Sequence, residues 1–157
     1  MSRKETSKTG PLSLDSGLVA SGLLHGTSLA CHGAGLLILG RSGTGKSSLA
    51  LELMSRGALL VSDDQTQIDL VDGALMASAP ATIRGLIEAR GVGLLNAEYA
   101  GPTPLKFVVS LDHIEAQRLP YFHTISLLGV TLPLLLKVPY PHFAAAILQY
   151  ANHGRRD

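Results

Sequence analysis

The sequence predicts an α/β fold with a mixed sheet, and two observations lead to this class. A glycine-rich loop at residues 40–47 lies between an apolar strand pattern and a helix pattern. Beyond it, short apolar runs are separated by glycines, and two of the runs have the spacing of an antiparallel hairpin. Strands that alternate with helices favour parallel pairing, and the hairpin adds an antiparallel portion.

The composition limits the class further. The chain has 157 residues, enough for one ordinary domain, and 46% of them are hydrophobic while 16% are charged, so a packed core is expected. Lys and Arg number 13 against 12 Asp and Glu, and this near-neutral balance argues against a nucleic-acid partner. The single cysteine, Cys31, cannot form an internal disulfide, which favours a reducing, cytoplasmic location.

The chain is expected to divide into a flexible tail, residues 1–17, and one domain, residues 18–157. The polar, turn-rich start predicts the tail. The apolar stretch at residues 18–31 is interrupted by Gly22, His25 and Gly26, so it does not indicate an export signal. The stretch at residues 125–138 is too short and too broken for a membrane span, and no membrane association is expected.

The elements of the first half follow from apolar runs and their boundaries. Gly35–Leu39 has the pattern of a buried strand, and Ser47–Arg56 contains strong helix formers that stop at Gly57. Ala58–Ser62 is again strand-like. Two further runs flank an Asp-Gly pair, which is typical of a hairpin turn; they are Gln67–Val71 and Ala74–Ser78.

The second half predicts two strands and a closing helix. The strands are Leu105–Leu111 and Leu132–Val138, both aliphatic. The helix is Pro141–Asn152, whose initial proline suits a helix start. Its apolar residues fall on one side at helical spacing; they are Phe143, Ile147, Leu148 and Ala151.

The glycine-rich loop fits the pattern G-x-x-x-x-G-K-[ST] of the P-loop that binds nucleoside triphosphates. Its glycines allow positive φ and close approach to phosphates, Lys46 is placed to reach the β- and γ-phosphates, and the Ser47 hydroxyl can bind Mg²⁺. The alternative is a glycine-rich surface turn. The predicted nucleotide-binding residues are Gly40, Arg41, Ser42, Gly43, Thr44, Gly45, Lys46 and Ser47.

Two adjacent acids, Asp63 and Asp64, end the strand after this helix. In open α/β sheets, the carboxyl ends of strands form the ligand crevice. Neighbouring side chains of an extended chain point in opposite directions, so one acid can face a metal and the other a substrate hydroxyl. A metal ligand next to a loop-capping aspartate is the alternative that the spacing leaves open.

Four stretches together resemble the catalytic domain of HPr kinase/phosphorylase, in the short form without an N-terminal domain. They are Leu24–Thr27, the P-loop, Leu60–Asp64 and Leu86–Leu95. The last is similar to the family's E-x-R-G-x-G signature and is the most specific. A weaker similarity runs from Glu115 to Pro133, so the resemblance covers nearly all of residues 18–152.

The resemblance implies a P-loop kinase domain of the HPr kinase and phosphoenolpyruvate carboxykinase type. It implies ATP- and Mg²⁺-dependent phosphorylation of a serine on the phosphocarrier protein HPr or an HPr-like protein of the phosphotransferase system. In some members it also implies dephosphorylation by inorganic phosphate, with pyrophosphate as a further co-substrate, and the family forms hexamers. A small-molecule P-loop kinase and a nucleotide-binding regulatory module are the alternatives.

The resemblance also assigns roles to single residues. Asp63 matches the acid/base, His25 lies beside the phosphates, and Arg118 neutralises charge on the transferred group. The implied metal ligands are Ser47, Asp64 and Glu88, while Arg90 joins the nucleotide-binding residues. Glu88 and Arg90 could instead form a structural ion pair. The chain departs from the family pattern at Ser48, where members often have an acid, and at Tyr140–Phe143, which replaces a Gly-Arg-Asn segment.

Overall fold

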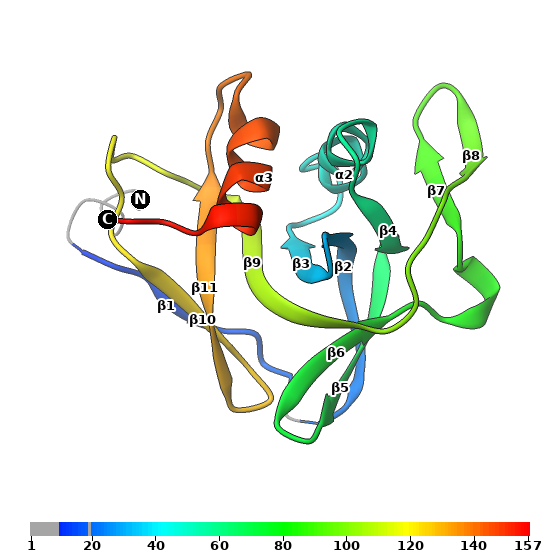
Figure 1. The fold of residues 1–157 in the computed structure, drawn as a ribbon, viewed down its shortest axis with the longest axis horizontal. Coiled ribbons are helices and arrows are strands. Elements are labelled where there is room, and N and C mark those ends of the chain that lie inside the picture. Colours follow the sequence, from blue (N-terminus) through cyan, green and yellow to red (C-terminus); the bar gives the residue numbers. More distant parts are fainter. Residues whose placement is uncertain (1–9, 19) are drawn as a thin grey trace.

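A computed structural model describes residues 10–18 and 20–157, which form one large mixed sheet, a separate hairpin and two α-helices (Figure 1). The nine-stranded sheet has the order β1-β10-β11-β9-β3-β2-β5-β6, with β4 paired to β2. Its strands are β1 (Ser13–Asp15), β2 (Gly22–Cys31), β3 (Ala34–Leu39), β4 (Leu59–Ser62), β5 (Gln65–Val71), β6 (Ala74–Ser78), β9 (Thr103–Ile114), β10 (His123–Leu127) and β11 (Val130–Lys137). The hairpin is β7 (Leu86–Ala89) with β8 (Gly93–Asn96), the helices are α2 (Lys46–Ser55) and α3 (Phe143–His153), and η2 (Ala81–Ile83) is a 3₁₀ turn.

The centre of the sheet consists of β3 and β9, which run parallel. Both are buried over their central residues, 35–38 in β3 and 107–111 in β9, where mostly apolar side chains cover both faces, as expected for parallel strands with packing on each side. β2 runs antiparallel to β3, and β4 runs antiparallel to β2. The end of β3, the end of β4 and the middle of β2 therefore meet at one edge of the sheet.

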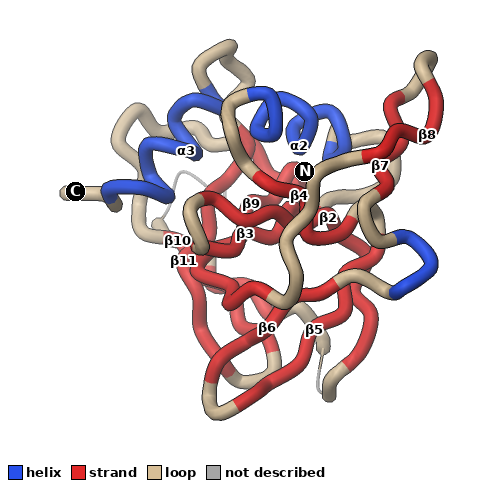
Figure 2. The backbone as a smooth tube through the Cα atoms, turned by 45° about the vertical axis from the view of Figure 1, so that its right-hand side comes forward, coloured by secondary structure: helices blue, strands red, loops and turns tan. Residues whose placement is uncertain are grey.

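The sheet curls because β9 has different partners along its length. Its first residues pair with β6, at Met76 with Pro104 and Ala77 with Thr103, whereas its later residues pair with β3 and β11. Strands β9, β3, β2, β5 and β6 therefore form a closed circuit (Figure 2). β1, β10 and β11 extend the sheet on the other side of β9.

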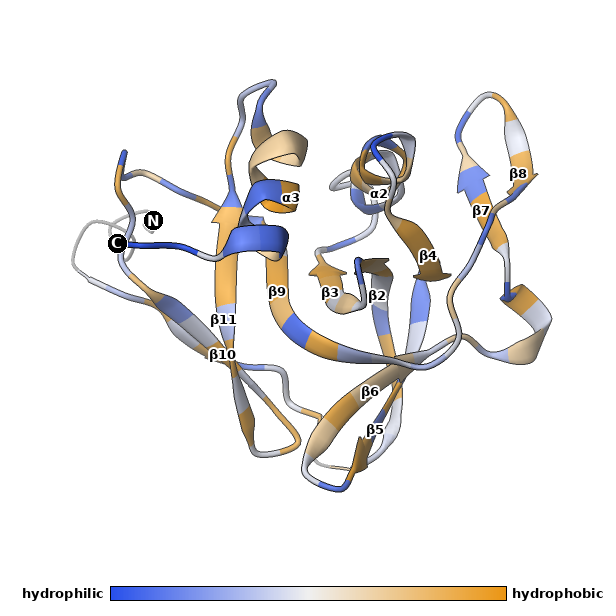
Figure 3. Cartoon of the chain, in the orientation of Figure 1, coloured by the Kyte–Doolittle hydropathy of each residue, from blue (hydrophilic) through white to orange (hydrophobic). Residues whose placement is uncertain are grey.

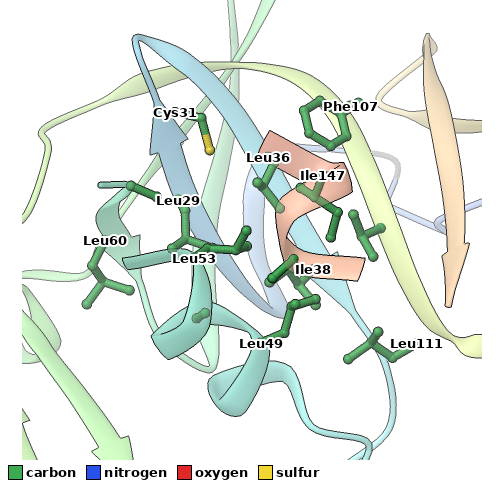
Figure 4. Packing of buried hydrophobic residues seen from close by; sticks show 14 of the residues in the cluster. Leu29, Cys31, Leu36, Ile38, Leu49, Leu53, Leu60, Phe107, Leu111 and Ile147 are labelled. Atoms are coloured by element: carbon green, nitrogen blue, oxygen red, sulfur yellow. The ribbon is translucent and has the colours of Figure 1, made fainter. Parts of the chain in front are cut away.

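Both helices cover one side of the sheet, whose central strands are coloured largely as hydrophobic (Figures 1 and 3). The buried side chains form two hydrophobic clusters. Neighbouring residues of a central strand contribute to opposite clusters: Phe107 faces the helices and Val108 faces the curled part. Figure 4 shows the cluster beneath the helices, where Leu53 of α2 and Ile147 of α3 meet side chains of the central strands. The core is aliphatic, as expected from the composition.

All of the predicted elements are confirmed, with their ends shifted by at most three residues. The hairpin turn is the clearest case, because Asp72 and Gly73 have φ of 50° and 79°, as a two-residue turn of this type requires. Helix α2 ends before Gly57, whose φ is 108°. The four side chains predicted for the apolar face of α3 all belong to the cluster beneath the helices.

Five strands were not predicted. β7 and β8 have four residues each, β2 contains Gly22 and Gly26, and β10 alternates buried and half-buried side chains over five residues only. β1 corrects the predicted tail: Ser13–Asp15 pairs in parallel with β10, so part of residues 1–17 belongs to the sheet. Residues 1–9 lie outside the described residues.

The apolar stretch at residues 125–138 forms the β10–β11 hairpin, whose side chains lie in the cluster of the curled part. A buried core strand therefore accounts for its hydrophobicity. Among the described residues, neither helix has the length and apolar character that a bilayer crossing requires.

Candidate active site

The glycine-rich loop leads directly from β3 into α2, as predicted. Gly43 and Gly45 have φ of 86° and 102°, a region that L side chains rarely adopt. Gly40 differs from the expectation, because its φ is not positive; it is required instead by crowding, since a Cβ there would overlap the Thr44 hydroxyl. The Thr44 hydroxyl donates to the Arg41 carbonyl at 2.7 Å and closes the loop.

Lys46 is turned back over this loop. Its ammonium donates to the carbonyls of Gly40 at 2.7 Å and Arg41 at 3.3 Å, and the residue is buried. Within the described residues no carboxylate lies within 4 Å of the ammonium. A buried cation with only neutral partners favours binding of an anion.

The first turn of α2 presents unpaired donors to the same space. The amides of Lys46, Ser47 and Ser48 have no intramolecular hydrogen bond within the described residues, and no side chain caps the helix. No acidic residue occupies the first turn. Free amides at a helix N-terminus, together with the helix dipole, attract phosphate groups.

Asp63 joins three elements next to the loop. Its Oδ1 accepts hydrogen bonds from the Ser47 hydroxyl at 2.8 Å and the Thr27 hydroxyl at 3.1 Å, and its Oδ2 accepts one from the Glu88 amide at 3.1 Å. The residue is 8% exposed. These contacts fix the orientation of the carboxylate between α2, β2 and β7.

Asp64 points the other way and is exposed. Its φ is 69°, and the Thr27 hydroxyl accepts a hydrogen bond from its amide at 3.1 Å. Its Oδ1 lies 3.5 Å from Nδ1 of His25, which is half-exposed on β2. The two acids therefore face different surroundings, as predicted, but the cause is different: with its positive φ Asp64 is not extended, so the alternation of an extended strand does not apply there.

A cavity of about 370 Å³ lies over the first turn of α2. Five of the P-loop residues predicted to bind nucleotide line it, together with Asp64, which follows β4, and residues at the end of β7. Glu88 lies in β7 and Arg90 directly follows it; the two do not form an ion pair with each other in the described part of the chain. The P-loop residues in the lining are Ser42, Gly43, Gly45, Lys46 and Ser47.

The donors around this cavity suit Mg²⁺ shared with phosphates. Ser47 offers a hydroxyl, and Asp64 and Glu88 offer carboxylates. Oxygen ligands in small number are typical of Mg²⁺, which keeps several waters and binds substrate phosphates. In the described residues no three His, Cys, Asp or Glu side chains form a cluster that could hold a metal by themselves.

Two arginines are placed differently from the expectation. Arg118 is exposed in the segment between β9 and β10 and does not line the cavity; further along this segment, the Pro120 carbonyl and the Phe122 ring contact Arg155 near the C-terminus. The structure thus does not bring Arg118 to the site. Arg41 also lies outside the lining; its side chain is 83% exposed and bonds Asp112 at 3.2 Å.

Thr27 is the residue that the sequence interpretation missed. Its hydroxyl donates to the Asp63 carboxylate and accepts from the Asp64 amide, so it holds both acids. It lies two residues after His25 on β2, and alternate residues of a strand share a face. The spacing of two residues between His25 and Thr27 is the signal in the sequence that could have identified Thr27 as a site residue.

The fold and the site together define an α/β protein with a glycine-rich loop, of the pattern that binds phosphate, at the carboxyl end of a central parallel strand. The family profile "HPr Serine kinase C-terminal domain" matches residues 17–117, and the chain belongs to this family.

Curated relatives agree with this membership. The HPr kinase/phosphorylase of Clostridium tetani is 43% identical over 83 residues, which are 53% of this chain and 27% of the relative. The HPr kinase/phosphorylase of a Geobacillus species is 44% identical over 100 residues, covering 59% of this chain and 32% of the relative. The chain thus matches about a third or less of the length of these relatives.

The fold is similar to that of the HPr(Ser) kinase/phosphatase from Coxiella burnetii. The TM-score is 0.72, and the match covers 83% of this chain and 88% of the solved one at 24% identity. This likeness supports the mixed α/β architecture.

Proposed function

We propose that this chain is an ATP- and Mg²⁺-dependent serine protein kinase that acts on HPr or an HPr-like phosphocarrier protein. The observation that carries the proposal is the position of Asp63, which is hydrogen-bonded to the P-loop serine beside a cavity with free phosphate-binding amides. Membership of the HPr serine kinase family and the printed names of the relatives support the substrate. Phosphoryl transfer needs positioning and charge neutralisation, and the site offers both.

The nucleotide would be held by the loop and the first turn of α2. The free amides and Lys46 face the β- and γ-phosphates, and Arg90 adds positive charge on the opposite wall. Ser47, Asp64 and Glu88 would hold Mg²⁺, which neutralises phosphate charge when bound. His25, next to Asp64, contributes a donor near the transferred phosphate.

The chemical step assigns the proton to Asp63. The seryl hydroxyl of HPr attacks the γ-phosphorus, a new O–P bond forms, the bond to the β–γ bridging oxygen breaks, and ADP leaves. The seryl proton goes to the Asp63 carboxylate. In dephosphorylation, an oxygen of inorganic phosphate attacks the phosphorus of phosphoserine, a P–O–P bond forms, and the seryl O–P bond breaks. Asp63 gives its proton to the serine oxygen, and pyrophosphate leaves.

The test is transfer of label from γ-labelled ATP with Mg²⁺ and purified HPr. Label on a serine of HPr, removed again by excess inorganic phosphate, is the expected result. ATP binding without label on HPr would contradict the kinase and favour a nucleotide-binding regulatory module.

The variant Lys46→Ala tests whether the glycine-rich loop binds the nucleotide. Because Lys46 is expected to contact the triphosphate in the ground state and during transfer, ATP affinity and turnover should fall together. Unchanged ATP affinity, measured by calorimetry, would contradict the P-loop assignment.

Assembly and location complete the proposal. The family resemblance supports a homo-oligomer, a hexamer, located in the cytoplasm. Light scattering of the purified chain measures the assembly, and a mass of one protomer would contradict it.

A further inference from the structure

A second cavity adjoins the P-loop on the other side of α2. It has a volume of about 310 Å³ and lies between the first two turns of α2 and the segment at residues 137–141, which leads from β11 into α3. This volume falls in the range of about 300–1,000 Å³ that is common for small-molecule sites. Gly45 and Ser48 line both cavities, so the two meet at the first turn of α2.

The two cavities differ in their chemistry. The first holds Lys46, Ser47 and the carboxylates of Asp64 and Glu88, which suit phosphates, metal and the hydroxyl of the protein substrate. The second contains none of these four residues. A triphosphate whose reacting end lay in the first cavity would pass the free amide of Ser48, and its nucleoside would then lie over the second cavity, because Gly45 and Ser48 line both.

Tyr140 offers a flat surface for a base in this second cavity. Its side chain is 63% exposed, and its ring is stacked on His142, with centroids 5.9 Å apart and planes at 22°. Pro139 and Pro141 flank it and restrict the backbone, and the Tyr140 carbonyl accepts a hydrogen bond from the Phe143 amide at 3.1 Å. An exposed, pre-oriented aromatic ring is typical of base-stacking sites.

The opposite wall carries a polar group for the sugar. Glu52 lies one turn after Ser48 on the same face of α2, and it lines the second cavity. A carboxylate accepts hydrogen bonds from ribose hydroxyls. Base platform, sugar acceptor and phosphate amides thus follow one another around the N-terminus of α2.

We propose that the second cavity is the nucleoside subsite of the P-loop, with Tyr140 stacked on the base. This inference rests on the proposed function, because it takes the P-loop to bind a nucleoside triphosphate. It adds a binding residue in the segment where the chain departs from the family pattern.

The experiment compares ATP with inorganic tripolyphosphate, which lacks the nucleoside. Binding of each, with Mg²⁺, is measured by calorimetry on the full chain and on Tyr140→Ala, Tyr140→Phe and Tyr121→Ala. Tyr140→Ala should weaken ATP binding about tenfold and leave tripolyphosphate binding unchanged. Tyr140→Phe keeps the ring and should bind ATP like the parent chain. Tyr121 lines a different cavity, so Tyr121→Ala controls for loss of a partly exposed tyrosine.

Three results would overturn the inference. If Tyr140→Ala binds ATP as tightly as the parent chain, Tyr140 does not stack on the base. If Tyr140→Ala binds ATP and tripolyphosphate more weakly by the same factor, the substitution has distorted the P-loop. Unchanged ATP affinity with slower transfer to HPr would assign the cavity to the protein substrate. By contrast, failure of the parent chain to bind either ligand would contradict the proposed function itself.

Discussion

The two adjacent acids, Asp63 and Asp64, differ in their burial and in their hydrogen bonds. Asp63 is buried and bonded to Ser47, Thr27 and the Glu88 amide, whereas Asp64 lines the open cavity beside His25. Both carboxylates lie near the loop, so the difference in their burial does not by itself show which acid is the base and which is the metal ligand. Asparagine variants of the two residues distinguish these roles.

Asp63→Asn is expected to lower transfer by about 10²–10⁴-fold, because the amide cannot accept the seryl proton. ATP binding should remain close to normal, since the Oδ1 of an asparagine can still accept the hydrogen bonds from the Ser47 and Thr27 hydroxyls. The assay is label transfer to HPr, alongside calorimetry of ATP binding.

Asp64→Asn is the matched variant, and it should change the Mg²⁺ dependence of transfer more than its maximal rate. If Asp63→Asn retained near-normal turnover while Asp64→Asn lost it, the acid/base role would belong to Asp64.

The thiol of Cys31 gives a prediction about pH. Burial raises the pKa of Cys31 to about 11 from an ordinary value of 9.0. Between these values the unfolded chain releases a proton that the folded chain keeps, so the free energy of unfolding should fall as pH rises from about 9 to about 11. Burial also raises the pKa of Tyr150, which acts in the same direction.

Urea denaturation at pH 8, 9 and 10 measures this dependence. Cys31→Ala removes the thiol and should show a shallower decline than the parent chain. Equal declines would mean that Cys31 does not contribute.

Among the elements, the contact between β3 and β9 depends on one glycine. A Cβ at Gly35 would lie 2.6 Å from the Pro104 carbonyl oxygen, which is backbone and cannot easily move. Gly35→Ala should therefore destabilise the fold by roughly 1–3 kcal/mol through overpacking.

Gly101→Ala is the control, since a Cβ there meets open space and the backbone is not in the positive-φ region. Thermal denaturation of the two variants is the measurement. A Gly35→Ala chain as stable as Gly101→Ala would show that the strands can separate at low cost.

The hairpin of β7 and β8 is the element that completes the site. It pairs with no strand of the large sheet, yet it brings Glu88 and Arg90 to the cavity and donates its Glu88 amide to Asp63. Its turn contains Gly91 and Gly93, both with positive φ. The signature segment therefore acts through the position of a hairpin that packs beside α2, as Figure 1 shows.

At the scale of the whole molecule, the buried pair of His123 and Glu115 connects the residues before β1 to the rest of the sheet. Nε2 of His123 donates to Glu115 at 2.8 Å, and both side chains are buried. Nδ1 of the same ring accepts the Leu12 amide at 2.8 Å, next to β1. One imidazole thus connects the start of the described chain, the segment after β9 and the start of β10.

Glu115→Ala would leave the His123 N–H without its partner in the core. We expect a loss of roughly 1–3 kcal/mol in the free energy of unfolding, and faster hydrogen exchange at the Leu12 amide. Glu98→Ala, at an exposed position, is the control.

Chemical denaturation and amide exchange measure the two effects. Parent-like stability and exchange in Glu115→Ala would show that the pair does not hold β1 in place.

Much of the fold was accessible from the sequence because local chemistry decides it. The glycine-rich loop, the helix stop at Gly57 and the Asp72-Gly73 turn each depend on backbone conformations that few residues adopt. The apolar runs of β3, β9 and β11 are long enough to indicate buried strands. Short strands such as β1 and β10 have three and five residues, too few for an apolar run of this kind.

By itself, the sequence determined the α/β class, the P-loop, the adjacent acids and the family resemblance, all of which are contiguous patterns. Only the tertiary structure decided which residues share the site. It brought Thr27, Asp63 and the Glu88 amide together, and it left Arg118 outside the cavity. The physical reason is contact between segments that are distant in the chain: β4 pairs with β2, which places Asp63 beside Thr27, and the β7–β8 hairpin packs beside α2, which brings the Glu88 amide to Asp63.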